Sequence, residues 1–233
     1  MIHSARIRHL IGVPPAAGAY VFYWMQQAQR TRENPALIYA LERAKLLDLP
    51  LVVGFVLTPD FPEANLRHYT FMAQGLAEVQ RSLDRLGVSF VLKTGDMVEN
   101  VMAMAEKAAW AVFDVGYLRV QREWRARLSR MLKCPVTQVE TDVVVPVESA
   151  SDKQEPAART IRPKLQKKLA DFMQPMPKPA YHLKGAAPPV TPADPIDPGR
   201  LAARAADGKK GPGPVARITV GQSEARGRLA GFI

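Results

Sequence analysis

The chain has 233 residues, 47% of them hydrophobic, which is enough for one well-cored domain and a smaller appendage. The net charge of +10 favours a polyanionic partner, although arginines that merely solvate helix surfaces would give the same balance. A single cysteine excludes an internal disulfide framework and fits a reducing cytoplasm. The four histidines are scattered without metal-ligand spacing, so no metal site is predicted. No stretch of the sequence is apolar over the length of a membrane span.

The first buried strand ends in a polar turn. Residues 1–18 are expected to form an N-terminal extension, after which the β-branched and aromatic run 20–25 indicates a strand buried on both faces. Amide and guanidinium side chains then follow one another: Gln26, Gln27, Gln29, Arg30, Arg32 and Asn34. In an open α/β sheet, ligands bind at the rim outside the carboxyl ends of the strands, so this turn is a site candidate.

Helix and strand patterns alternate over the next hundred residues. Strands are predicted at 50–57, 88–93, 110–114 and 135–140, with a further candidate at 143–147, and helices at 35–48, 67–86, 97–108 and 118–132. This alternation predicts an α/β domain over residues 19–148, built on an open, mostly parallel, five-stranded Rossmann-like sheet with helices on both faces.

The strand order decides where a site can form. A flavodoxin-like order with the strands at 20–25 and 110–114 as neighbours would bring their carboxyl ends together. No glycine-rich dinucleotide motif or P-loop follows the first strand, which disfavours a Rossmann dinucleotide site and a Walker-type NTPase. Structural roles remain open for the residues at these ends: core packing for Trp24, a helix cap for Asp114 and a turn with positive φ for Gly116.

The composition changes after residue 148. Residues 149–173 form a basic segment with a helix expected at 157–173, whose cations could steer DNA, pack against another domain or solvate the helix. Residues 174–214 hold half of the 20 prolines and few large apolar side chains, which predicts an extended or disordered linker. A short element follows at 215–233, and we expect the chain to be cut there at the start of a further domain.

Five segments, in order, resemble the class II cyclobutane-pyrimidine-dimer DNA photolyases of the photolyase/cryptochrome family. They are YWMQQAQRTRENPAL (23–37), LTPDFPEANLRHYTFM (57–72), GYLRVQREWR (116–125), ETDVVVPVE (140–148) and ASDKQEPAARTIRPKL (150–165). One such segment is weak evidence, whereas five in the same order are specific. The chain departs from the pattern at Val115, where the relatives usually carry a polar or basic residue, and at Pro156, where they usually carry an aromatic one.

The resemblance implies light-driven electron transfer from reduced FAD to a cyclobutane pyrimidine dimer that is flipped out of duplex DNA. It implies that FAD and the lesion bind to an all-helical domain, supplied in cis or in trans, of which residues 215–233 would be the truncated start. It implies for the α/β half a slot for an auxiliary light-harvesting chromophore, often a deazaflavin. The residues expected at the mouth of this slot are Tyr23, Trp24, Met25, Gln26, Asp114, Gly116, Tyr117 and Leu118.

Three functions therefore stay open for this chain. The first is the antenna half of a deoxyribodipyrimidine photolyase, a DNA-repair lyase, with no catalytic residue of its own and inactive alone because it lacks the FAD domain. The second is a stand-alone chromophore- or nucleotide-binding module without catalysis. The third is a cryptochrome-like light sensor. In each case we expect a cytoplasmic protein without membrane contact or metal.

Overall fold

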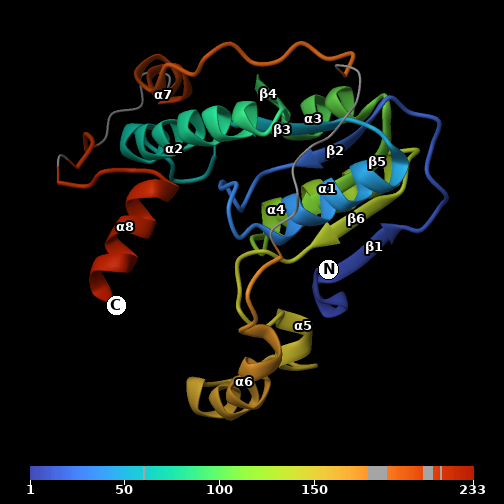
Figure 1. Ribbon diagram of the computed structural model, residues 1–233. Helices are drawn as coiled ribbons and strands as arrows, with labels where there is room; N and C mark the ends of the chain where they lie inside the picture. Colours follow the sequence, from blue (N-terminus) through green and yellow to red (C-terminus); the bar gives the residue numbers. More distant parts are fainter. Residues whose placement is uncertain (60, 178–187, 207–211, 216) are drawn as a thin grey trace.

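The computed structural model describes residues 1–59, 61–177, 188–206, 212–215 and 217–233. In this part of the chain, six strands form one open sheet in the order β1-β6-β5-β2-β3-β4 (Figure 1). All neighbours pair in parallel except β1, which lies antiparallel to β6 at one edge. The strands are β1 (Ile7–Ile11), β2 (Tyr20–Trp24), β3 (Leu51–Leu57), β4 (Ser89–Thr94), β5 (Ala108–Asp114) and β6 (Val136–Val139).

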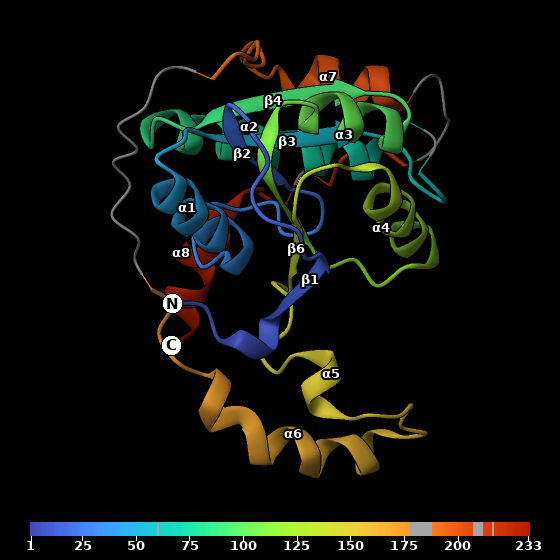
Figure 2. The same ribbon diagram turned by 90° about the vertical axis from the view of Figure 1, so that its right-hand side faces the viewer.

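The helices cover both faces of the sheet, which confirms the predicted fold class. Helices α1 (Pro35–Leu47) and α2 (Leu66–Arg85) pack on one face, and α3 (Met97–Ala105) and α4 (Arg119–Met131) on the other. Figure 2 shows α1 and α4 on opposite sides of the strands. Side chains of β2 alternate between the two cores, as the continuous apolar run predicts for a central strand.

The details of the sheet correct the sequence prediction in two respects. The parallel strands β2 to β6 follow the order 3-2-1-4-5, which is that of the first five strands of a Rossmann fold, not the flavodoxin-like order 2-1-3-4-5. A sixth strand, β1, lies in the predicted N-terminal extension and pairs Ile7 with Val139. The strand order was wrong because hydrophobic periodicity predicts where strands lie but not which strands pair. β1 was not predicted because it is a short, half-exposed edge strand interrupted by polar residues. The expected pairing of β2 with β5 is present.

The predicted strand at 143–147 is wrong. The chain turns there and enters the short helix α5 (Val147–Ala150). The guanidinium of buried Arg6 donates hydrogen bonds to the carbonyl oxygens of Glu140, Val143 and Val144, so these acceptors need no neighbouring strand.

Part of the predicted linker is helical and docked on the domain. Helix α7 (Pro198–Ala206) buries three alanines against α2, and the Gln80 side chain of α2 binds the backbone of Ala193, Asp194 and Ile196. The buried side chains of α7 are small, and the segment is rich in proline, which is why the composition predicted an extended segment. Residues 178–187 and 207–211 of this stretch lie outside the described residues.

The last element, α8 (Gln222–Phe232), lies against the turn that follows β2. The side-chain oxygen of Gln222 accepts a hydrogen bond from the Thr31 backbone at 2.9 Å, and Arg226 pairs with Glu33 at 3.1 Å. None of the helices in the described ranges is long and apolar enough to cross a membrane.

Helix α6 (Ala158–Phe172) stands apart from the sheet and packs with α5 in a small separate core (Figure 1). Its contact with the preceding loop is ionic. Lys164 donates to Glu155 at 2.5 Å, and Ser151 donates to the same carboxylate at 2.7 Å. These bonds lower the pKa of Glu155 to about 2.

This contact predicts a pH dependence of the α5–α6 region. A carboxyl whose folded pKa lies below its unfolded value of about 4.3 stabilises the fold above that value, and this contribution is lost as the pH falls towards 2. We expect the carboxyl carbon resonance of Glu155 to titrate near pH 2 in the native protein and at a clearly higher pH in Lys164→Ala, in which the bond from Ser151 remains. A native midpoint above pH 4 would contradict the contact.

Candidate ligand-binding site

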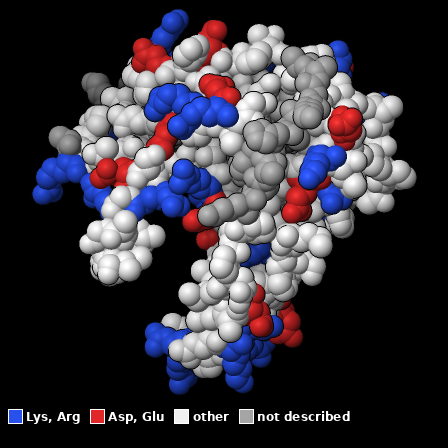
Figure 3. All heavy atoms as spheres, in the orientation of Figure 1, with Lys and Arg blue, Asp and Glu red and all other residues white. Residues whose placement is uncertain are grey.

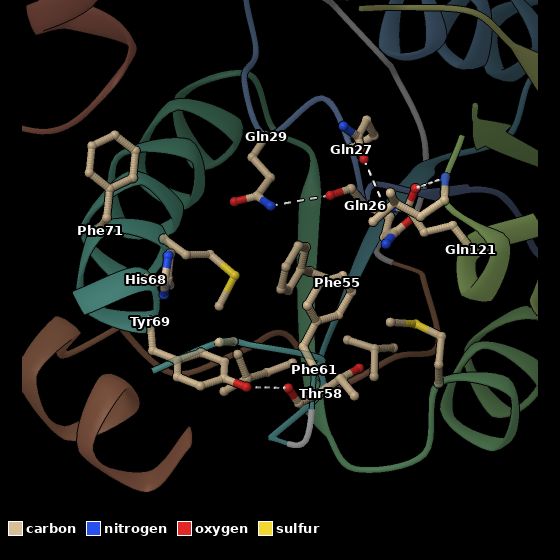
Figure 4. Close-up of a pocket in the computed structure, with 16 residues that line it drawn as sticks. Gln26, Gln27, Gln29, Phe55, Thr58, Phe61, His68, Tyr69, Phe71 and Gln121 are labelled. Carbon is tan, nitrogen blue, oxygen red and sulfur yellow. Dashed lines mark hydrogen bonds between the residues drawn. The ribbon is translucent and has the colours of Figure 1, made fainter. Parts of the chain in front are cut away.

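A cavity of about 440 Å³ opens at the carboxyl ends of β2 and β3 (Figure 4). Its walls come from the turn after β2, the end of β3 and the loop behind it, the first turns of α2, and the starts of α3 and α4. The residues that line it are Gln26, Gln27, Gln29, Phe55, Val56, Leu57, Thr58, Phe61, Ala64, His68, Tyr69, Phe71, Met72, Met97, Leu118 and Gln121. Ligand pockets typically enclose ~300–1,000 Å³, so the space suits one small organic molecule.

The lining combines apolar walls with amide groups. Phe55, Phe61, Phe71 and Met72 provide flat and polarisable surfaces, and several glutamines lie along one side. Figure 4 shows the side chain of Gln29 directed at Gln26. Its Nε2 donates a hydrogen bond to the backbone carbonyl oxygen of Gln26 at 3.2 Å. Aromatic walls and a few oriented donors and acceptors are the features that hold a planar heterocycle.

A buried ion pair fixes the turn on which these amides lie. One carboxylate oxygen of Asp114, at the end of β5, accepts the backbone N–H groups of Gln26, Gln27 and Ala28 at 3.0, 2.7 and 2.9 Å. The other oxygen accepts from Arg125 of α4 at 3.0 Å. Two separate elements, β5 and α4, thereby lock the turn after β2.

Arg125 links this ion pair to the cavity wall. Its guanidinium donates to the carbonyl oxygen of Asp114 at 2.8 Å and to the side-chain oxygen of Gln26 at 2.9 Å, and it lies 4.8 Å from the ring centre of Trp24. Burial raises the pKa of Asp114, and the guanidinium and the N–H groups oppose that rise. Burial lowers the pKa of Arg125, opposed by Asp114. Both groups have their partners inside the protein, so neither is free to bind a ligand.

The predicted slot residues fall into two groups. Gln26 and Leu118 line the cavity. Tyr23, Trp24 and Met25 point into the two cores, where the Tyr23 hydroxyl bonds to Asn34 and Trp24 meets Phe113 edge-on at 5.0 Å.

The others on the β5 side have structural partners. Asp114 holds the turn as described, and the Tyr117 hydroxyl donates to Glu140 at 2.6 Å. Burial and the bond to Glu140 raise the pKa of Tyr117. Asp114 supports the cavity wall through the turn, and neither Asp114 nor Tyr117 belongs to the cavity lining.

Gly116 is required by close packing and not by positive φ, because its backbone is outside the left-handed region. A Cβ there would lie 2.6 Å from the Gln121 side-chain oxygen and 2.7 Å from Arg125 Nη1. We expect Gly116→Val to lower the free energy of unfolding by about 1–3 kcal/mol through displacement of Arg125. Urea denaturation measures this. An unchanged urea midpoint would contradict this prediction, because it would show that α4 can shift without loss of stability.

The slot residues predicted from the sequence do not include the wall formed by α2 and the loop before it, although His68 was a candidate contact for the polar tail of the chromophore. Thr58, Phe61, Ala64, His68 and Phe71 all lie within the segment 57–72, which follows the carboxyl end of β3. Its position after a strand that neighbours β2 was the available signal. No cluster of His, Cys, Asp and Glu suited to a metal ion occurs among the residues that the structure describes.

Comparisons with known proteins agree on one family. The family model for DNA photolyase matches residues 21–180. A deoxyribodipyrimidine photo-lyase of Methanothermobacter thermautotrophicus is 46% identical over 177 residues, which are 76% of this chain and 40% of that protein. One from Potorous tridactylus is 36% identical over 164 residues, 69% of this chain and 31% of that protein. The chain thus spans less than half the length of these relatives.

Solved structures show the same fold. An archaeal photolyase from Sulfolobus tokodaii, described with two FAD molecules and the implication of a novel light-harvesting cofactor, superimposes with a TM-score of 0.54 at 14% identity. The match covers 63% of this chain and 34% of that one.

Proposed function

The chain belongs to the DNA photolyase family, and we propose that it is the antenna half of a deoxyribodipyrimidine photolyase, which binds a planar light-harvesting chromophore in the cavity beside β2 and β3. The observation that carries the proposal is the cavity itself, with its aromatic walls and its row of amides at the carboxyl rim of the sheet. In the whole enzyme such a chromophore absorbs light and passes the excitation to FAD.

The chemistry of the lining favours an uncharged ring of the deazaflavin class. The rim amides Gln27 and Gln29 and the Nε2 atom of His68 can pair with carbonyl and N–H groups on a heterocycle edge, while Nδ1 of His68 accepts from the Asn65 backbone N–H at 3.2 Å. Neither Lys nor Arg is among the described residues that line the cavity, so these residues offer no Lys or Arg cation to the pyrophosphate of a dinucleotide. We therefore propose that FAD, the pyrimidine dimer and the chemistry of repair belong to a helical domain, in cis or in trans.

The cellular setting fits this proposal. The buried, unpaired Cys134 suits a reducing cytoplasm, where we place the protein. The DNA substrate follows from the family, and we expect that the isolated chain does not remove dimers from irradiated DNA.

A titration tests the proposal. We expect a deazaflavin without a charged tail to bind the purified chain with one-to-one stoichiometry and with a Kd below ~10 μM, seen as a change in deazaflavin fluorescence. An equal concentration of FAD should not displace it. Absence of binding to the folded chain, tighter binding of FAD, or light-dependent dimer removal by the chain alone would contradict the proposal.

A further inference from the structure

Helix α6 carries a concentration of positive charge that the cavity does not use. Its 15 residues contain one acidic residue, Asp171, and the cations Arg159, Arg162, Lys164, Lys167 and Lys168. Figure 3 shows Lys and Arg atoms gathered over this helix, at the end of the molecule farthest from α2.

The apolar side of α6 is already covered. Leu165, Leu169 and Phe172 pack with Val145 and Ala150, and the Phe172 ring lies 4.7 Å from the His3 ring. The exposed positions of the helix hold no large apolar side chain. A partner that covers this outward side must therefore be recognised by charge and not by apolar packing.

Among the residues that the structure describes, three exposed cations of α6 have no partner. Lys164 pairs with Glu155, but no ion pair or hydrogen bond engages the side chains of Arg159, Arg162 or Lys167 within the described ranges. Their order also opposes the helix dipole, because Arg159 lies in the first turn and Asp171 in the last. Helix stability therefore does not explain these charges.

We propose that the outward face of α6 contacts the phosphate backbone of duplex DNA. The inference rests on the proposed function, which gives the protein a DNA substrate. From Arg159 to Lys167 the helix rises about 12 Å, and one DNA strand carries a phosphate about every 3.4 Å of its axis. The cations thus match a run of about three phosphates. A lipid surface fits less well, because a helix that lies in a membrane inserts an apolar face, and α6 packs its apolar residues against α5.

The test is a DNA titration at two salt concentrations. A fluorescein-labelled 20-base-pair duplex is titrated with the full chain, with the triple variant Arg159→Gln, Arg162→Gln, Lys167→Gln, and with a control of equal charge. The control is Arg81→Gln, Arg85→Gln, Lys93→Gln, at the α2 and β4 end of the molecule (Figures 1 and 2). Fluorescence anisotropy gives the affinity, and circular dichroism checks the fold.

We expect the α6 variant to bind DNA at least ~10-fold more weakly at 50 mM salt and its salt slope to be shallower by about 2–3, since each phosphate contact contributes about 0.9. The control should stay within ~2-fold of the native chain, and both variants should bind deazaflavin normally.

Equal DNA affinity in the two variants, or no DNA binding by the native chain, would overturn the inference. Tighter binding to phosphatidylserine vesicles than to DNA would instead identify a membrane and also overturn it. Since deazaflavin binding is measured separately, a result that contradicts the proposed chromophore site can be distinguished from one that contradicts DNA binding by α6.

Discussion

Replacing Arg125 with methionine is expected to lower the free energy of unfolding by about 3–5 kcal/mol. The substitution leaves Asp114 buried with its charge uncompensated, while the three N–H groups of the turn still point at it. The cation above Trp24 and the bond to Gln26 are lost as well. Urea denaturation with linear extrapolation measures the effect.

The control is Arg130→Met, a substitution of the same type at an exposed position of α4, which should change stability by no more than ~0.5 kcal/mol. The pH dependence gives a second check. Without Arg125 the folded pKa of Asp114 rises further above its unfolded value, and a raised carboxyl pKa costs stability as the pH increases through it. The deficit of Arg125→Met should therefore shrink as the pH falls. A deficit below ~1 kcal/mol at pH 7 would show that the ion pair is not what fixes the turn.

Filling the cavity is expected to abolish chromophore binding without harm to the fold. Ala64 is a small, half-buried residue of the lining, so in Ala64→Phe a ring occupies space that the chromophore needs. We expect deazaflavin affinity to fall by ~100-fold or more, equivalent to about 2.8 kcal/mol of binding free energy.

The matched control is Ala103→Phe, at an exposed position of α3 outside the lining. Its affinity should equal that of the native chain, and the urea midpoints of both variants should remain close to native. Native affinity in a folded Ala64→Phe variant would exclude the cavity as the binding site.

The sheet could be predicted from the sequence more fully than the binding site. The continuous apolar run of β2 predicts a strand buried on both faces, and the two core clusters that share it agree. The polar residues that follow β2 also indicate, from the sequence alone, a turn at the rim of the sheet. The role of Asp114, by contrast, depends on strand order, because only a neighbour of β2 can reach the backbone of residues 26–28.

Two further features depend on three-dimensional proximity. Arg125 lies in a helix whose other arginines are solvated, and its spacing from Gln121 and Leu128 places it on the buried face, but that spacing does not reveal its partner Asp114. The α7 alanines lack the size that marks a core residue in a sequence, although they are buried against α2. In both cases the partner across the fold, which periodicity does not encode, explains why the residue is buried.

The most direct test of the central claim is to locate the chromophore on the protein. Backbone ¹H–¹⁵N spectra of the labelled chain are recorded with and without one equivalent of deazaflavin. The cavity site predicts large shifts for the amides of Gln29, His68 and Leu118, which come from three separate elements around the space, and none for Arg130 or Cys134. Shifts confined to residues outside the lining, with those three amides unmoved at saturation, would contradict it.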